Sequence, residues 1–253
     1  RVFREPHGTP AERLCRSLEL ANEEIYAHAL SNSELRGMGT TAVAVMIAPD
    51  GGAWLAWVGD SRCYRLRDRN LEALSRDHSL MSEWISLGVI TSDAARTHPR
   101  RHELMRAIGQ APDVSIEHVA IELRPGDRLL LCSDGLHGYV DERAIARALA
   151  SGDPRSAAAA LVDAANDAGG PDNVSVVVAV VASGWSPAQA QSGPSPLSRS
   201  PCSPAWARSV RGPVAHRSCA APSACWSGAR LRWLSQPPWA QCSGPWWAKP
   251  TQR

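Results

Sequence analysis

Acidic residues are absent from the C-terminal part of the chain. No Asp or Glu occurs from Gly184 onward, whereas eight of the 27 basic residues lie there. Residues 1–183 hold all 25 acidic residues and are net acidic, although the whole chain has a charge of +2. This division predicts a folded, mildly acidic body over residues 1–183 and a separate basic segment over residues 184–253.

Several other absences narrow the class of protein. The longest largely apolar run, residues 174–182, is about half of the roughly 20 residues that span a bilayer, so we expect no membrane segment. The seven cysteines show no zinc-like CxxC pair, and a reduced, cytoplasmic setting fits them best. The chain begins with Arg1 and shows no signal-peptide pattern, so we interpret it as part of a longer product.

Residues 184–253 have the composition of a low-complexity segment. They contain seven of the ten Trp residues, interleaved with Pro, Ser, Arg and Cys, and show no helical or strand periodicity. We therefore predict a disordered tail, a composition that a shifted reading frame of a GC-rich gene would also produce. Basic residues among aromatic ones can bind single-stranded nucleic acid. We rank that function last and expect no nucleic-acid partner.

Residues 1–183 alternate between strand-like and helix-like patterns. Thr9, Pro10 and Glu12 form a capping box that starts an amphipathic helix ending near Leu30. Further helices are predicted over residues 141–150 and from 153 to about 168, and two short helices within an insert at residues 77–110. Strands are predicted at residues 41–48, 53–59, 62–67, 71–74, 114–123, 129–132 and 174–182. Strands joined by hairpin turns predict an α+β fold with mainly antiparallel sheet.

Three aspartates stand where predicted strands end or turn. Asp134 follows the apolar strand 129–132, Asp172 precedes the run 174–182, and Asp60 separates two strands. None of them lies near a Cys or His pair, so they suggest oxygen ligands for Mg²⁺ or Mn²⁺ rather than for zinc. Taken singly, each is more simply a turn residue, because Asp-Gly and Pro-Asp-Asn are ordinary turn sequences.

The order of five short motifs favours a metal-binding role for these aspartates over a role in turns alone. They are GMGTT at 37–41, VGDSR at 58–62, RDHS at 76–79, CSDGL at 132–136 and GGPDN at 169–173. Together they resemble the bacterial branch of the PP2C-type (PPM) metal-dependent serine/threonine protein phosphatases, over about residues 11–182. The resemblance implies a PP2C-like antiparallel β-sandwich flanked by helices. It also implies hydrolysis of phosphoserine and phosphothreonine in proteins by a water activated by two or three Mn²⁺ or Mg²⁺ ions.

The resemblance assigns roles to individual residues. Asp134 and Asp172 match two metal ligands of the family, and Asp60 matches a ligand of an additional, weaker metal, with a turn-capping role as an equal alternative. Residues 77–110 match the flap beside the catalytic cleft. Three of the arginines there, Arg100, Arg101 and Arg106, are candidates to bind a phosphorylated substrate, although a solvated basic face is slightly favoured. The implied partners are phosphorylated proteins and a serine/threonine kinase.

The sequence departs from the family pattern at its start. The opening strands of the family, with their phosphate-binding Arg, Glu-Asp pair and Asp-Gly-x-Gly-Gly motif, have no counterpart upstream of Thr9. The implied fold therefore lacks its first strands, which should expose sheet edges and lower solubility. The Asp that bridges the two metals would be missing, so we expect one loosely held ion and a chain that can be inactive as it stands. The alternative is a pseudophosphatase that acts as a protein-interaction module.

Overall fold

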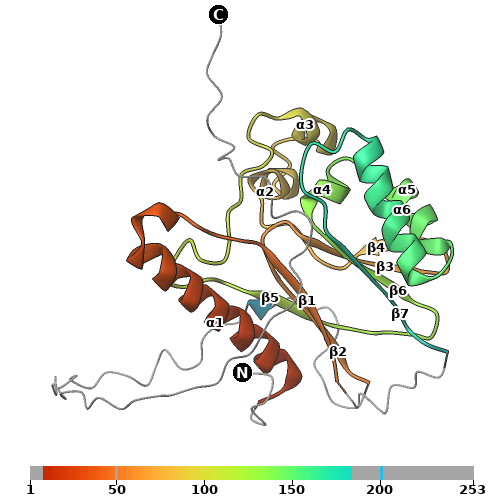
Figure 1. The fold of residues 1–253 in the computed structure, drawn as a ribbon, viewed down its shortest axis with the longest axis horizontal. Helices are drawn as coiled ribbons and strands as arrows, with labels where there is room; N and C mark the ends of the chain where they lie inside the picture. The colour runs from red at the N-terminus through yellow and green to blue at the C-terminus, as the bar shows by residue number, and fades with distance from the viewer. Residues whose placement is uncertain (1–7, 49–50, 184–199, 202–253) are drawn as a thin grey trace, which may run out of the picture. The chain divides into compact units, whose positions relative to one another are not determined.

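The computed structural model describes residues 8–48, 51–183 and 200–201 (Figure 1). The prediction for residues 184–253 therefore lies outside the described residues, except at positions 200–201. The helical segments are α1 (Pro10–Ser31), η2 (Ser33–Leu35), α2 (Leu80–Ser86), α3 (Ser92–Thr97), α4 (Asp134–His137), α5 (Glu142–Ala150) and α6 (Pro154–Asp167). The strands are β1 (Ala42–Ile47), β2 (Ala53–Val58), β3 (Arg62–Arg67), β4 (Asn70–Ala73), β5 (Glu117–Ile121), β6 (Arg128–Cys132), β7 (Val176–Val180) and β8 (Ser200–Pro201).

The strands form two antiparallel sheets. One has the order β1-β2-β5-β8 and the other the order β4-β3-β6-β7. The hairpin between β1 and β2 pairs Ala42 with Val58, and β6 pairs with β7 so that Cys132 is opposite Val176. The predicted antiparallel α+β architecture is confirmed, with β5 and β7 shorter than the runs from which they were predicted.

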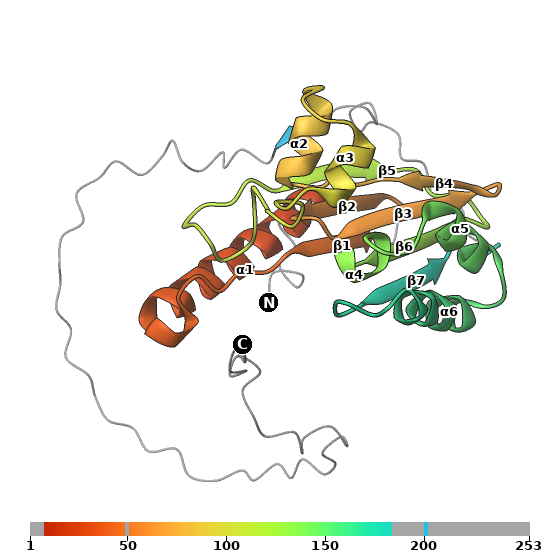
Figure 2. The same ribbon diagram turned by 90° about the horizontal axis from the view of Figure 1, so that it is seen from above.

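The two sheets pack face to face and helices cover their outer faces (Figures 1 and 2). In β2, Leu55 and Trp57 enter the core between the sheets, whereas Ala56 and Val58 pack against residues of α1. Side chains on a strand point alternately to its two faces, so one apolar strand supplies two cores. The result is four layers: α1, the first sheet, the second sheet, and α5 with α6.

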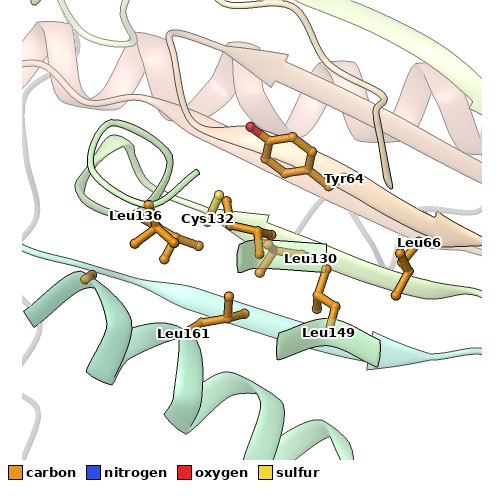
Figure 3. Close-up of a cluster of buried hydrophobic side chains, with 10 residues drawn as sticks. Tyr64, Leu66, Leu130, Cys132, Leu136, Leu149 and Leu161 are labelled. Carbon is orange, nitrogen blue, oxygen red and sulfur yellow. The ribbon is translucent and has the colours of Figure 1, made fainter. Parts of the chain in front are cut away.

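Figure 3 shows the core between the second sheet and its helices. Leu130 and Cys132 of β6 face this core, and Leu149 of α5 and Leu161 of α6 pack against them. Leu136 of α4 belongs to the same cluster and has no exposed surface. This packing holds α4 at the end of β6, so the residue that opens α4, Asp134, has a fixed place at the sheet end.

Capping residues mark the helix starts that the sequence predicted. Thr9 and Glu12 form both hydrogen bonds of the capping box, Asp141 caps α5 and Asp153 caps α6. Ser79 caps α2, the first helix of the insert. None of the helices in the described part of the chain is long and apolar enough to cross a membrane.

Within the described residues, β1 and β7 are edge strands of their sheets. Val177 of β7 is 61% exposed although its neighbours Val176 and Val178 pack against the helices. An edge strand with an exposed valine can pair with another chain, as predicted from the sequence. Low solubility remains a prediction.

Candidate metal site

The ladder between β6 and β7 brings the segments of Asp134 and Asp172 to one sheet end. Beyond the last paired residues, the Ser133 amide donates to the Ser175 carbonyl over 3.1 Å. The Ser175 amide donates in return to Ser133 Oγ over 3.0 Å. Ser133 thus extends the antiparallel pairing past the strand ends, and the loop that follows Asp172 is fastened beside Asp134.

Gly135 allows an unusually close approach at this point. A Cβ atom at position 135 would lie 2.3 Å from the Asn173 carbonyl oxygen, a distance that no side chain tolerates. The Asp-Gly sequence therefore lets the start of α4 touch the loop that carries Asp172. Asp172 itself is exposed, and its carboxylate accepts a hydrogen bond of 2.7 Å from the Asn173 amide.

Asp60 lies on the turn between β2 and β3, half-buried near Asp134. The pKa of Asp60 is raised to about 6, mainly by burial and also by the negative charges of Asp134 and Asp77. Arg62 lowers the pKa of Asp60 only weakly. Asp60 and Asp134, 74 positions apart in sequence, are therefore electrostatic neighbours.

Two further side chains fix the surroundings of Asp60. His137 of α4 donates a hydrogen bond of 2.9 Å from Nε2 to the Asp60 carbonyl oxygen. Burial and the charge of Arg62 lower the pKa of His137, so its ring is neutral at neutral pH. Arg62 binds both carboxylate oxygens of Asp77 at 2.7 Å and donates to the Tyr64 hydroxyl at 2.8 Å. The turn is thus tied to α4 and to the RDHS segment.

These carboxylates fit a divalent cation only in part. Neither Asp60 nor Asp134 forms an ion pair with a basic side chain among the described residues, although each feels the charge of the other. Hard oxygen donors that repel one another suit Mg²⁺ or Mn²⁺. Yet no three His, Cys, Asp or Glu side chains in the described ranges are grouped closely enough to enclose a metal ion. Asp60, Asp134 and Asp172 therefore remain candidate ligands, and the single loosely held ion expected from the sequence stays a prediction.

The arginines of the insert are less available than the sequence suggested. Arg100 binds Glu103 through two hydrogen bonds of 2.6 Å and lies over the Trp84 ring. Arg106 contacts Glu117 at 3.2 Å, and Arg101 is exposed. Among the described residues, Arg101 is therefore the candidate of the three that forms no ion pair.

Sequence reasoning assigned no role at the site to four residues that surround the turn: Arg62, Asp77, His78 and His137. Arg62, Asp77 and His78 lie within the VGDSR and RDHS motifs, and that position was the only signal available. Their mutual contacts depend on the tertiary fold.

Several known proteins are similar in sequence to the part of the chain that carries the candidate site. Residues 3–166 match the family model described as Protein phosphatase 2C. Serine/threonine phosphatase stp of Listeria monocytogenes is 38% identical over 166 residues, which are 65% of this chain and 66% of stp. PstP of Mycobacterium tuberculosis is 38% identical over 177 residues, 70% of this chain and 34% of PstP. The chain thus spans less than two thirds of the length of these relatives.

Solved structures agree with the sequence comparison. The M. tuberculosis phosphatase PstP/Ppp is 36% identical and has a TM-score of 0.67, with 72% of this chain and 77% of that chain covered. The PstP catalytic domain in complex with two manganese ions has a TM-score of 0.65 at the same identity, with 71% and 75% covered. Family model, relatives and fold lead to one conclusion: the chain belongs to the protein phosphatase 2C family.

Proposed function

We propose that this chain hydrolyses phosphoserine and phosphothreonine in proteins in a metal-dependent reaction. The observation that carries the proposal is the electrostatic proximity of two half-buried carboxylates, Asp60 and Asp134, neither of which pairs with a basic side chain among the described residues. Its support is the family membership and the similar PstP structure with two manganese ions. A pseudophosphatase is not favoured, because the relatives are named as phosphatases.

Different residues of the chain would have different roles at the proposed site. Asp134 and Asp172 would hold a Mn²⁺ or Mg²⁺ ion jointly, and Asp60 would contribute to a second or third ion. Divalent ions, when bound, acidify water and neutralise phosphoryl oxygens, which is the chemistry that phosphate-ester hydrolysis needs. Ser133 and Gly135 keep the two segments of the site together, and His137 orients the turn of Asp60.

The insert would supply the contact with substrate. Arg101 can bind the phosphate or an acidic residue of a phosphorylated protein without breaking an ion pair to any described residue. Arg100 and Arg106 would first have to leave Glu103 and Glu117. The proposal also includes a serine/threonine kinase that phosphorylates the substrate proteins. It places the reaction in the cytoplasm.

The test is Mn²⁺-dependent release of phosphate from a phosphothreonine peptide by the whole chain, compared with the same protein in excess chelator. Asp134→Asn and Asp172→Asn should each lower the rate at least about 100-fold, because even residues that only orient metal ligands are worth 10- to 100-fold. Asp141→Asn is the matched control, since Asn caps α5 as well as Asp does. Metal-independent release, or full activity of Asp134→Asn, would contradict the proposal.

A further inference from the structure

A buried histidine contacts both backbone groups of the residue that precedes Asp60. The His78 side chain has 4% of its surface exposed. Its Nδ1 atom accepts a hydrogen bond of 3.2 Å from the Gly59 amide. The His78 amide in turn donates to the Gly59 carbonyl over 2.9 Å. Gly59 is therefore held from two directions by one residue.

The same histidine is joined to the insert on its other side. Its carbonyl accepts a hydrogen bond of 2.8 Å from the Met105 amide. Its Nε2 lies 3.2 Å from a carboxylate oxygen of Glu117. The same Glu117 oxygen contacts Arg106 at 3.2 Å. His78 thus stands between the turn of Asp60 and the segment 104–106.

The ring of His78 has little freedom to move. Trp57 stacks against it with ring centroids 6.2 Å apart and an interplanar angle of 27°. Trp57 is itself fully buried and fixed by a hydrogen bond of 2.8 Å from Nε1 to the Arg76 carbonyl. Rotation of the imidazole would therefore break the bond to Gly59 without offering the buried amide another partner.

We propose that His78 is a positioning residue, which fixes the backbone at Gly59 so that Asp60 keeps the orientation needed to bind a divalent cation, and which couples that turn to the insert. The inference rests on the proposed function, because it takes Asp60 as a ligand. Groups that orient metal ligands without touching the metal are worth 10- to 100-fold in metal affinity. A substrate that displaces the insert would act on Asp60 through the same contacts.

Two amide replacements separate positioning from packing. In His78→Asn the side-chain oxygen can occupy the place of Nδ1 and still accept from Gly59. In His78→Gln the amide reaches the place of Nε2 and leaves Gly59 without an acceptor. Binding of Mn²⁺ to the whole chain is measured by the electron paramagnetic resonance signal of free Mn²⁺. We expect His78→Gln to lower the Mn²⁺ affinity of the site that includes Asp60 about tenfold. His78→Asn should lower that affinity less than about twofold.

The control is Asp127→Asn, which disturbs a buried ion pair with Arg67 at the opposite end of β6 and should leave Mn²⁺ affinity unchanged. If His78→Gln and the unchanged chain bind Mn²⁺ with equal affinity, the inference is overturned. Amide hydrogen exchange of Gly59 in the metal-free protein tests it independently, and should be at least about tenfold faster in His78→Gln than in His78→Asn. If the unchanged chain binds no Mn²⁺, the proposed function fails, and the exchange at Gly59 still decides whether His78 positions the turn.

Discussion

The guanidinium of Arg62 and the carboxylate of Asp77 form a bidentate ion pair, with both hydrogen bonds 2.7 Å long. Their side chains are 27% and 14% exposed, so the pair is largely withdrawn from water. It joins the VGDSR turn to the RDHS segment. A planar guanidinium suits this geometry, because its two donors match the two carboxylate oxygens.

Removing one partner of this pair should be costly. Asp77→Asn leaves the buried guanidinium without its counter-charge, and we expect the free energy of unfolding to fall by about 2–3 kcal/mol. Urea denaturation measures the loss. The matched control is Glu23→Gln, which removes an exposed ion pair with Arg16 and should change stability by less than about 0.5 kcal/mol. Similar effects of the two substitutions would show that the Arg62–Asp77 pair does not hold the turn.

The raised pKa of Asp60 makes the stability of the metal-free protein depend on pH. The pKa is about 6 in the folded state and has its ordinary value of 3.8 when unfolded. Between these values the folded state binds more protons, so stability falls as pH rises from about 4 to 6, and the full cost persists above that range. Asp60→Asn should therefore stabilise the metal-free protein at pH 8 by about 1–2 kcal/mol, after allowance for solvent screening of a half-buried group.

The stabilising effect of Asp60→Asn should disappear below about pH 4, where Asp60 is protonated in both states. Unfolding free energies at pH 4 and pH 8 in excess chelator give the comparison. A variant that is destabilised at both pH values would show that the Asp60 carboxylate is stabilised by its surroundings, contrary to its burial near Asp134.

Ser133 offers a way to separate the two segments that carry the candidate ligands Asp134 and Asp172. Its hydroxyl accepts from the Ser175 amide at 3.0 Å and contacts the Asn173 carbonyl at 3.4 Å. Ser133→Ala should lower stability by only about 1 kcal/mol. It should lower Mn²⁺-dependent phosphatase activity more strongly, about tenfold, because the loop that follows Asp172 then loses a hydrogen bond that fastens it beside the start of α4.

The control for Ser133→Ala is Ser151→Ala, which removes a hydroxyl hydrogen bond to Ala148 at the end of α5. Thermal denaturation and peptide dephosphorylation are measured on both variants. If activity falls only in proportion to the folded fraction, Ser133 has no role beyond stability.

Local sequence signals were sufficient for most of the fold. The apolar run of residues 53–59 predicts a strand, and in the structure Leu55 and Trp57 enter one core while Ala56 and Val58 enter another. The capping box at Thr9 predicts where α1 begins. The short helix α4 was missed, because its four residues directly follow a strand and are held by packing of Leu136. The four-layer arrangement was implied by the family resemblance, and periodicity alone did not predict it.

The candidate site was less accessible to sequence reasoning. No local pattern relates Asp60 to Asp134, since their proximity depends on how the two turns meet at the end of the second sheet. The family resemblance supplied that link. The pairing of Arg106 with Glu117 was also hidden, because the partner lies on β5 outside the insert. Long-range ion pairs of this kind require the fold to be known.

Gly59 provides the sharpest test of how the Asp60 turn is built. Its φ angle is +100°, a conformation that side chains rarely adopt, and an added Cβ would lie 2.3 Å from Cγ2 of Thr41. Gly126 has a similar φ of +89° but open space around it. Gly126→Ala should therefore show only the backbone strain, about 1–2 kcal/mol. Gly59→Ala should cost at least about 2 kcal/mol more, because Thr41 must also move.

A second substitution shows whether that additional cost comes from Thr41. Thr41→Ser removes Cγ2 but retains the hydroxyl, which hydrogen-bonds to the Ser61 hydroxyl at 2.8 Å. In the background of Gly59→Ala, Thr41→Ser should restore part of the lost stability, although the Thr41 Cβ at 2.7 Å limits the recovery. Unfolding free energies of the two single variants and the double variant form the cycle. Strict additivity would mean that Gly59 is required for its backbone conformation alone, and that the close packing of the turn on β1 contributes nothing.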